Sequence, residues 1–263
     1  FMLMMINRAV DFSKSSSGLT LTPSLETINI YESISWVIKC SCPSKNTPII
    51  IEPISSIICP TIITDKQWLI ENLLCLISNA QKFTVEGAIT IRCFLETVDN
   101  GTTETKSCHS DTFNRADSLK QFNSKILNKQ KNYFPQSSFR QMFRIEVEDL
   151  GVGIPPEKRC ELFQPFKKAQ QHSGGTGLGL YSILKRVESL GGDCGITDRR
   201  DKKYGSCFWF SFPYRPDTTV LENSNYIRNF TFDIATNVIE TDLTPEDFHS
   251  DKQKNQKYIN NKG

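Results

Sequence analysis

Two glycine-rich segments and one acid give this chain the residue types of a site for a phosphorylated ligand. Residues 145–149 alternate apolar and acidic side chains as a strand does, and the pattern breaks at Gly151 and Gly153. Asp149 is therefore expected at a strand end, beside glycines that let a flat ligand approach the backbone. Residues 174–180 precede a helical pattern, and such a turn presents amide N–H groups and a positive dipole end to anions. The two segments predict a nucleotide pocket.

Neither glycine segment is specific by itself. A glycine cluster before a helix also serves as a tight, closely packed turn. The spacing does not fit the dinucleotide fingerprint Gly-x-Gly-x-x-Gly followed by an acid about twenty residues later. No Gly-Lys-Ser/Thr phosphate loop follows either. The nucleotide interpretation therefore needs a third element.

A mostly apolar helix over residues 68–83 supplies that element. Thr64 and Gln67 have capping-box spacing before it. On a 3.6-residue period, a polar stripe covers about a third of its circumference. The stripe consists of Asn72, Cys75, Asn79 and Lys82. One interpretation is that the stripe is a solvated edge of the helix. The other is that it belongs to a site in which Asn79 helps hold Mg²⁺ and Lys82 contacts phosphate. Mg²⁺ takes oxygen ligands and keeps several waters, which suits an amide oxygen.

Four segments resemble, in order and spacing, the sequence boxes of the histidine-kinase ATPase domain of the GHKL superfamily. NLLCLISNAQKFT (72–84) is similar to the N box, DLGVGIP (149–155) to the first glycine box, LFQPF (162–166) to the F box and GGTGLGL (174–180) to the second glycine box. The resemblance implies the Bergerat fold. That fold is α+β, a two-layer α/β sandwich whose mixed, mostly antiparallel sheet carries helices on one face, here with an N-terminal helix remnant.

The resemblance also implies the role of each matching residue. Asp149 would accept a hydrogen bond from the adenine amino group, Asn79 would ligate Mg²⁺, and Asn79 and Lys82 would form the catalytic pair. The implied cofactors are ATP and Mg²⁺, and the implied reaction transfers the γ-phosphate to a histidine outside this chain. The implied nucleotide-binding residues are Asp149, Gly151, Gly153, Ile154, Phe166, Gly175, Thr176, Gly177, Leu178 and Gly179.

Two departures from the family pattern qualify this function. Cys75 stands one turn before Asn79, where the superfamily carries an Asn or a Glu base. A thiol is a poor Mg²⁺ ligand and a poor base for water, which argues against an efficient ATPase. An alternative is a degenerate ATP-binding or regulatory module without kinase activity. The chain's histidines do not match the family's phosphoacceptor box, so the acceptor is expected in trans or upstream. They are His109, His172 and His249.

The chain divides into three expected parts. Residues 1–23 resemble the end of a dimerisation and phosphoacceptor helix, residues 24–214 the ATPase domain, and residues 215–263 read as a polar linker or tail. Within the domain, residues 99–141 are rich in polar side chains and are expected to be a disordered insertion. Its aromatic residues could instead form a docking motif. These are Phe113, Phe122, Tyr133 and Phe134.

Other elements follow from periodicity and turn residues. A strand over residues 88–95 is expected to pair antiparallel with residues 142–148. A lid is expected over residues 163–175, followed by a helix that stops at Gly191. The remaining expected elements are helices over 27–42 and 157–162, strands over 48–52 and 57–63, and a closing hairpin of 194–197 and 205–212.

Composition excludes several classes of protein. The formal net charge is +2 over 263 residues, so neither a nucleic-acid-binding face nor an acidic tail is implied. The nine cysteines are odd in number and lack paired C-x-x-C spacing, which favours free thiols in a reducing compartment. A cytoplasmic location is expected, in a parent protein that could be membrane-anchored. The expected partners are a phosphoacceptor histidine domain, a downstream receiver and a second copy joined through upstream helices.

Overall fold

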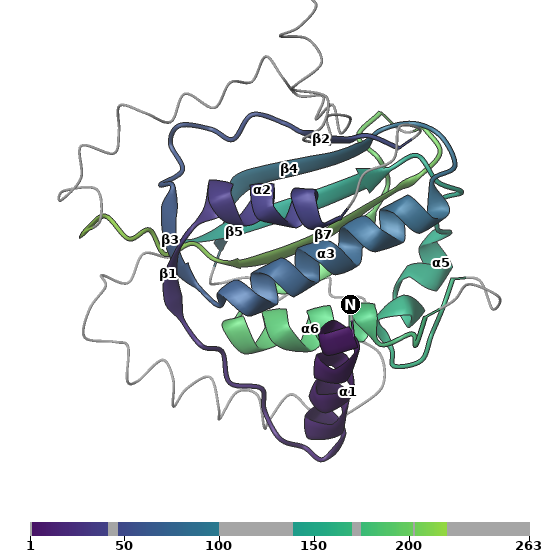
Figure 1. Cartoon of the computed structure of the whole chain (residues 1–263), viewed down its shortest axis with the longest axis horizontal. Coiled ribbons are helices and arrows are strands. Elements are labelled where there is room, and N and C mark those ends of the chain that lie inside the picture. The colour runs from purple at the N-terminus through teal and green to yellow at the C-terminus, as the bar shows by residue number, and fades with distance from the viewer. Residues whose placement is uncertain (1, 42–46, 100–138, 170–174, 202, 220–263) are drawn as a thin grey trace, which may run out of the picture. The chain divides into compact units, whose positions relative to one another are not determined.

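A five-stranded mixed sheet, in the order β2-β4-β5-β7-β6, forms the centre of the fold (Figure 1). The computed structural model describes residues 2–41, 47–99, 139–169, 175–201 and 203–219. They belong to the first of two units, residues 1–229; the second unit, residues 230–263, lies outside the described residues. The strands are β2 (Ile49–Ile51), β4 (Ile89–Asp99), β5 (Phe139–Asp149), β6 (Asp193–Thr197) and β7 (Ser206–Pro213). Only β2 and β4 run parallel within this sheet, so the expected mostly antiparallel sheet is confirmed.

The central pairing, β4 with β5, is the one that the sequence predicts. It runs from Thr90 opposite Glu148 to Asp99 opposite Phe139, several residues longer than expected at its far end. The intervening residues 100–138 lie outside the described residues, and with them most of the expected insertion and the aromatic residues of the alternative docking motif. On its other side β5 pairs with β7, which brings Asp149 opposite Ser206.

Helices α2 (Ile30–Cys40), α3 (Lys66–Phe83) and α6 (Gly179–Leu190) cover one face of this sheet (Figure 1). The expected capping box at the start of α3 is wrong. Asp65 is the N-cap, and its Oδ1 accepts the backbone N–H of Trp68 at 2.8 Å. The Asp65 carboxylate takes this role because its other oxygen accepts the N–H of Ser24 at 2.8 Å, a partner distant in sequence. Helix α6 ends at Gly191, as expected, with a left-handed φ of 81°.

A second, two-stranded sheet was not expected. Strand β1 (Glu26–Asn29) pairs antiparallel with β3 (Thr61–Thr64). The helix expected over residues 27–42 therefore begins only at Ile30, because the Asn29 side chain caps it there by accepting two backbone N–H groups.

The strand expected over residues 57–63 is also shorter than predicted. It begins after Pro60, which has no N–H group to donate to a ladder. Downstream, the Ile63 N–H donates to the Arg215 carbonyl at 2.8 Å, and the Asp217 N–H donates to the Thr61 carbonyl at 2.9 Å. The packed chain thus continues beyond residue 214, where the sequence suggested a boundary.

Two short helices follow β5. They are α5 (Pro156–Arg159) and the 3-10 helix η1 (Glu161–Phe163), so the single helix expected over residues 157–162 is interrupted at Cys160. Pro156 suits the first position of α5, because proline has no backbone N–H group and the N–H groups of a first helical turn have no partner within the helix. Among the described residues, no helix combines the length and apolarity needed to cross a membrane.

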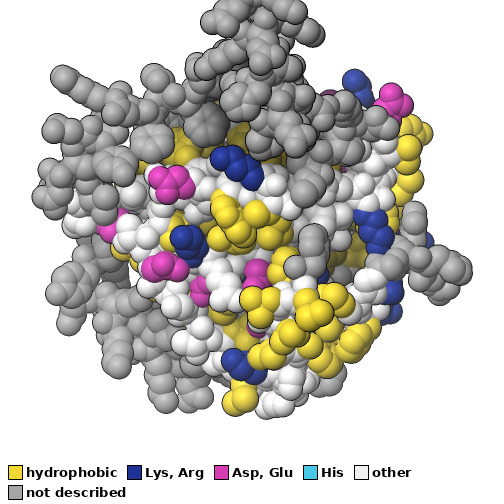
Figure 2. Space-filling model, viewed as in Figure 1, with side chains coloured by type: hydrophobic (Ala, Val, Ile, Leu, Met, Phe, Trp, Pro, Cys, Tyr) yellow, Lys and Arg dark blue, Asp and Glu magenta, His cyan; other side chains and the backbone are white. Residues whose placement is uncertain are grey.

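Helix α1 (Met2–Ser16) precedes the domain and packs on α6. Its side chains repeat at intervals of three and four residues on the buried or half-buried face. This docked face consists of Met4, Asn7, Arg8, Asp11, Phe12 and Ser15. The rest of the helix is exposed and largely apolar, and Figure 2 shows hydrophobic side chains gathered over it.

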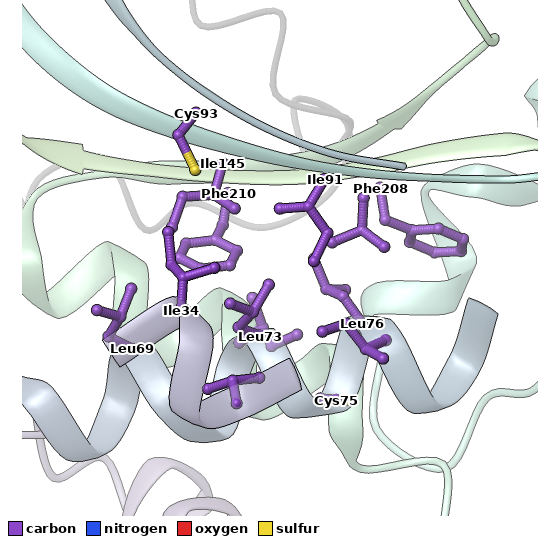
Figure 3. Close-up of a cluster of buried hydrophobic side chains, with 14 of the residues drawn as sticks. Ile34, Leu69, Leu73, Cys75, Leu76, Ile91, Cys93, Ile145, Phe208 and Phe210 are labelled. Carbon is purple, nitrogen blue, oxygen red and sulfur yellow. The ribbon is translucent and has the colours of Figure 1, made fainter. Parts of the chain in front are cut away.

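The core lies between the five-stranded sheet and the helices beneath it (Figure 3). Ile91, Ile145 and Phe210 point down from the strands toward Leu73 and Leu76 of α3, and all five are at most 2% exposed. Burial of this apolar surface is the main force that holds the layers together. The cysteines of the described residues are free thiols, as predicted: Cys40, Cys59, Cys75, Cys93, Cys160, Cys194 and Cys207.

A buried arginine joins three helices. The Arg186 side chain of α6 is 2% exposed; its Nε donates to Asp11 Oδ2 at 2.8 Å and its Nη2 to Glu71 Oε2 at 2.6 Å. Its Nη1 donates to Asn72 Oδ1 at 3.4 Å. Glu71 also accepts a hydrogen bond from Asn7 Nδ2 at 2.6 Å. A buried charge network of this kind tolerates the loss of one member poorly, because the others stay desolvated.

We expect Arg186→Met to lower the free energy of unfolding by about 3–5 kcal/mol, since it leaves Glu71 buried without a cation. Urea denaturation of the whole chain measures the change. Arg200→Met is the matched control, because that side chain is 57% exposed beside Glu146 and its loss should cost less than about 1 kcal/mol. Equal costs for the two variants would contradict the role given to Arg186.

Candidate functional site

The last residue of β5, Asp149, is a buried carboxylate at the end of a central strand. Its Oδ1 accepts the Gly151 N–H at 2.8 Å, and the backbone of Ser206 also donates to the carboxyl group. Burial raises the pKa of Asp149, and these hydrogen bonds together with the Arg199 charge oppose the rise. A buried acid with a perturbed pKa at a strand end is a common feature of binding sites.

The first glycine segment lies against the C-terminal end of α3. A Cβ on Gly151 would stand 2.8 Å from Asp149 Oδ1 and 2.8 Å from the Phe83 carbonyl oxygen, so no side chain fits there. Gly153 has a left-handed φ of 74°. Ile154, which follows, is half-buried against the core.

The second glycine segment is joined to the F box. A Cβ on Gly177 would stand 2.7 Å from the Phe166 carbonyl carbon, and the Phe166 N–H donates to the Gly177 carbonyl at 3.0 Å. Phe166 is exposed, and its ring meets the ring of Phe12 edge-on, with 4.9 Å between the ring centroids. Gly175 and Thr176 are exposed at the start of this segment. Gly174 and His172 lie outside the described residues.

The start of α6 lies against the middle of α3. A Cβ on Gly179 would stand 2.7 Å from Cys75 Sγ, so this contact also depends on a missing side chain. No side chain caps α6 at Leu178. The backbone N–H groups of its first turn are therefore available to an anion, in the field of the positive helix end.

Helix α3 connects the two glycine segments. Phe83 meets the first of them and Cys75 the second, and Asn79 lies halfway between. Residues four apart share one face of a helix, and a rise of 1.5 Å per residue separates Phe83 from Cys75 by about 12 Å. Segments far apart in the sequence thus contact the same helix, one at its C-terminal end and one at its middle.

The polar stripe predicted on α3 is divided in the structure. Asn72 and Cys75 are buried, the former on Arg186 and the latter against Gly179, so a solvated edge is wrong for both. Asn79 is half-buried and Lys82 exposed. Asn72 does not replace the polar residue missing at position 75, because its Oδ1 accepts from Arg186.

The Asn79 amide oxygen has no hydrogen-bond partner among the residues that the structure describes. The Asn79 Nδ2 donates to Cys75 Sγ at 4.0 Å, which turns Oδ1 away from the thiol. Burial raises the pKa of Cys75, so the sulfur remains protonated and is a poor ligand for Mg²⁺.

A magnesium ion fits this donor set only with a nucleotide. Within the described ranges, no group of three or more His, Cys, Asp or Glu side chains could hold a metal ion. Magnesium nevertheless binds through one or two protein oxygens when phosphates and waters fill its other positions. The Asn79 amide oxygen is compatible with such a site.

Sequence reasoning missed the charges that support Asp149. The neighbouring Glu148 is buried and pairs with Arg92 at 2.5 Å and Arg199 at 3.1 Å. Arg199 Nη1 also donates to the Asp149 backbone carbonyl at 2.8 Å. The alternation of apolar and acidic side chains at residues 145–149 predicted the strand, but it did not indicate which cations pair with its acids. The arginines that pair with Glu148 come from distant segments.

Comparison with known proteins agrees with this architecture. Residues 127–216 match the family described as "Histidine kinase-, DNA gyrase B-, and HSP90-like ATPase". "Probable histidine kinase 2" of Oryza sativa subsp. japonica is 30% identical over 162 residues, which are 58% of this chain and 15% of that protein. "Sensor histidine kinase GacS" of Pseudomonas protegens is 27% identical over 217 residues, 80% of this chain and 19% of that protein. The chain thus spans less than a fifth of the length of these relatives.

Among solved structures, full-length ShkA in complex with AMPPNP has the same fold. The TM-score is 0.56 at 22% identity, over 82% of this chain and 36% of that one. The buried acid at the end of β5 and the two glycine segments on α3 lie in or beside the matched region. Residues 127–216 thus match the histidine kinase-, DNA gyrase B- and HSP90-like ATPase family, and the chain is similar to histidine kinases.

Proposed function

We propose that the chain is the ATP-binding catalytic domain of a two-component hybrid sensor histidine kinase, which transfers the γ-phosphate of Mg-ATP to a histidine outside this chain. The observation that carries the proposal is the contact of both glycine segments with α3, with Asp149 buried at the adjoining strand end. The names of the relatives and the AMPPNP bound by ShkA support it.

Adenine would bind at the Asp149 end of the site. The carboxylate would accept a hydrogen bond from the adenine amino group, and the purine would lie against the bare backbone at Gly151 and Gly153, with Ile154 as an apolar neighbour. Guanine carries a carbonyl where adenine carries the amino group. Guanine would therefore set an acceptor against the buried carboxylate and lose the hydrogen bond from the base, at a cost of about 1–3 kcal/mol.

The phosphates would extend along α3 toward Gly179. Amide groups of the second glycine segment would donate to phosphate oxygens, and Phe166 would hold this segment through its bond to Gly177. Lys82 would offset phosphate charge. The residues of the segment are Gly175, Thr176, Gly177, Leu178 and Gly179. Phosphoryl transfer requires mainly positioning and charge neutralisation, which these groups supply.

Magnesium, when bound through Asn79, would supply charge neutralisation at the phosphates. The helix carries no glutamate one turn before Asn79, so the site lacks the base of a mechanical ATPase. The buried Cys75 thiol is the observation that favours the second candidate, a nucleotide-binding module without kinase activity. The histidine kinases among the relatives favour the kinase.

The wider arrangement of the protein is part of the proposal. Residues 1–23 would end a dimerisation and phosphoacceptor helix, 24–214 would form the ATPase domain with the insertion 99–141, and 215–263 would be a linker or tail. The partners would be a phosphoacceptor histidine domain, a receiver domain and a second copy of the protein, and the domain would act in the cytoplasm. The exposed apolar side of α1 suits a helix that continues into a dimer.

Replacement of the buried acid tests the adenine site. We expect Asp149→Asn to weaken the binding of an ATP analogue about a hundredfold or more, because the amide cannot replace a charged acceptor. Isothermal titration calorimetry measures the affinity. Asp198→Asn, at a side chain that is 73% exposed, is the control and should change nothing. Unchanged affinity in Asp149→Asn would show that adenine binds elsewhere.

The same variant has an expected effect on stability. Burial raises the pKa of Asp149 above 3.8, so the folded protein holds this proton more tightly than the unfolded chain does. The group's contribution to stability is therefore complete below pH 3.8 and is lost as the pH rises through the folded-state pKa. Asp149→Asn should raise Tm at pH 7, by an amount that shrinks on acidification. A constant difference in Tm across pH would contradict the buried, ionised carboxyl.

Phosphotransfer separates the kinase from the inactive module. We expect the chain to label a separate acceptor-histidine domain with γ-labelled ATP, at a rate that rises about tenfold in Cys75→Asn, which adds an amide oxygen beside Asn79. Cys75→Ala, which removes the thiol without adding an oxygen, should not accelerate transfer. Nucleotide binding with no transfer by any variant would favour the inactive module, and steady phosphate release without acceptor would point to an ATPase.

A further inference from the structure

The docked face of α1 is held in place by specific partners. Asp11 pairs with the buried Arg186, and Asn7 donates to Glu71 of α3 at 2.6 Å. Phe12 contacts Phe166 at 4.9 Å between ring centroids and Tyr181 at 5.8 Å. These contacts fix both the position of α1 and its rotation about its axis. Any other side chain on this face therefore has a defined direction.

Arg8 is the member of this face whose charge lacks an acceptor. It lies one turn before Asp11 and Phe12, and it is half-buried. Its guanidinium forms no hydrogen bond or ion pair with any residue that the structure describes. Its Nη1 lies 3.6 Å, and its Cζ 3.7 Å, from the position that a Cβ on Gly179 would take. The charge also acts on the Cys75 thiol, whose pKa it lowers against the larger effect of burial.

This placement is unfavourable unless an anion is present. A cation beside the first residue of α6 faces the positive end of the helix dipole, and the uncapped N–H groups there have the same polarity. Partial burial adds a desolvation cost for the guanidinium. An anion between Arg8 and the first turn of α6 would accept hydrogen bonds from the guanidinium and from the backbone N–H groups at the same time. A phosphate group suits the site, because the planar guanidinium binds phosphate oxygens in bidentate geometry.

The position along α3 indicates which phosphate is involved. Gly151 contacts α3 at Phe83, and Gly179 contacts it at Cys75, about 12 Å farther along the helix. With adenine at the Asp149 end, the group that reaches Gly179 is the far end of a triphosphate. Arg8 lies at this far end.

We propose that Arg8 is a phosphate-binding residue supplied by α1, and that its guanidinium donates to the terminal phosphate of the nucleoside triphosphate held at Gly179. The inference rests on the proposed function, since it takes adenine to bind at Asp149. Asp11 and Asn7 are positioning residues in this arrangement, because they dock α1 without meeting the nucleotide. The site for the triphosphate is then complete only while α1 is docked.

The test compares a triphosphate with a diphosphate on the whole chain. We expect Arg8→Ala to weaken binding of a non-hydrolysable ATP analogue about tenfold, and of ADP less than about twofold, in calorimetric titrations with Mg²⁺. Arg8→Lys keeps the charge without the bidentate fork and should fall between Arg8→Ala and the parent chain. Lys14→Ala removes a cation from the exposed side of the same helix and should bind both nucleotides as the parent does.

Two results would overturn the proposal. Unchanged affinity for the triphosphate in Arg8→Ala would show that the guanidinium does not reach it. An equal loss for both nucleotides would show that Arg8 only supports the packing of α1. Failure of the adenine site is distinguishable from either, because Asp149→Asn would then bind both nucleotides with the affinity of the parent chain.

Discussion

The close approach of two backbone segments to α3 is the constraint on which the rest of the site depends. At Gly151 and at Gly179 a single added carbon would stand within 3 Å of an atom of this helix. Contacts that short are possible only for glycine. The helix is itself fixed from behind by Leu73 and Leu76 in the core, so the glycine segments are placed by a rigid element.

Two buried glutamates near the site are each neutralised by arginines from distant segments. Arg92 and Arg199 pair with Glu148 beside the end of β5, and Arg186 pairs with Glu71 of α3. Asp149 differs because its partners are mainly backbone N–H groups. These N–H groups do not cancel the effect of burial, which raises the pKa of Asp149. The acid that is left least compensated is the one that would meet a ligand.

Much of the architecture is readable from local pattern. Alternation of side chains predicted β4, β5 and the closing hairpin, and the glycine pair after Leu190 predicted the end of α6. The cap at Asp65, the strand at residues 26–29 and the division of the α3 stripe were not predicted, because each depends on a partner more than thirty residues away. Asn72 illustrates the reason. Its polar amide suggested a solvated position, but the amide is buried because its oxygen accepts a hydrogen bond from Arg186, which is distant in sequence.

The backbone of Phe166 carries a consequence of its own. Its φ of 65° places a bulky residue in the left-handed region, which costs about 1–3 kcal/mol and persists only when neighbours impose it. The neighbours are the Gly177 carbonyl and the ring of Phe12. A substitution of Phe166 therefore has two opposite effects on stability: loss of its aromatic ring destabilises the protein, and relief of the backbone torsion stabilises it. At this position glycine and alanine are unequal truncations, and the difference between them isolates the torsional energy from the aromatic contact.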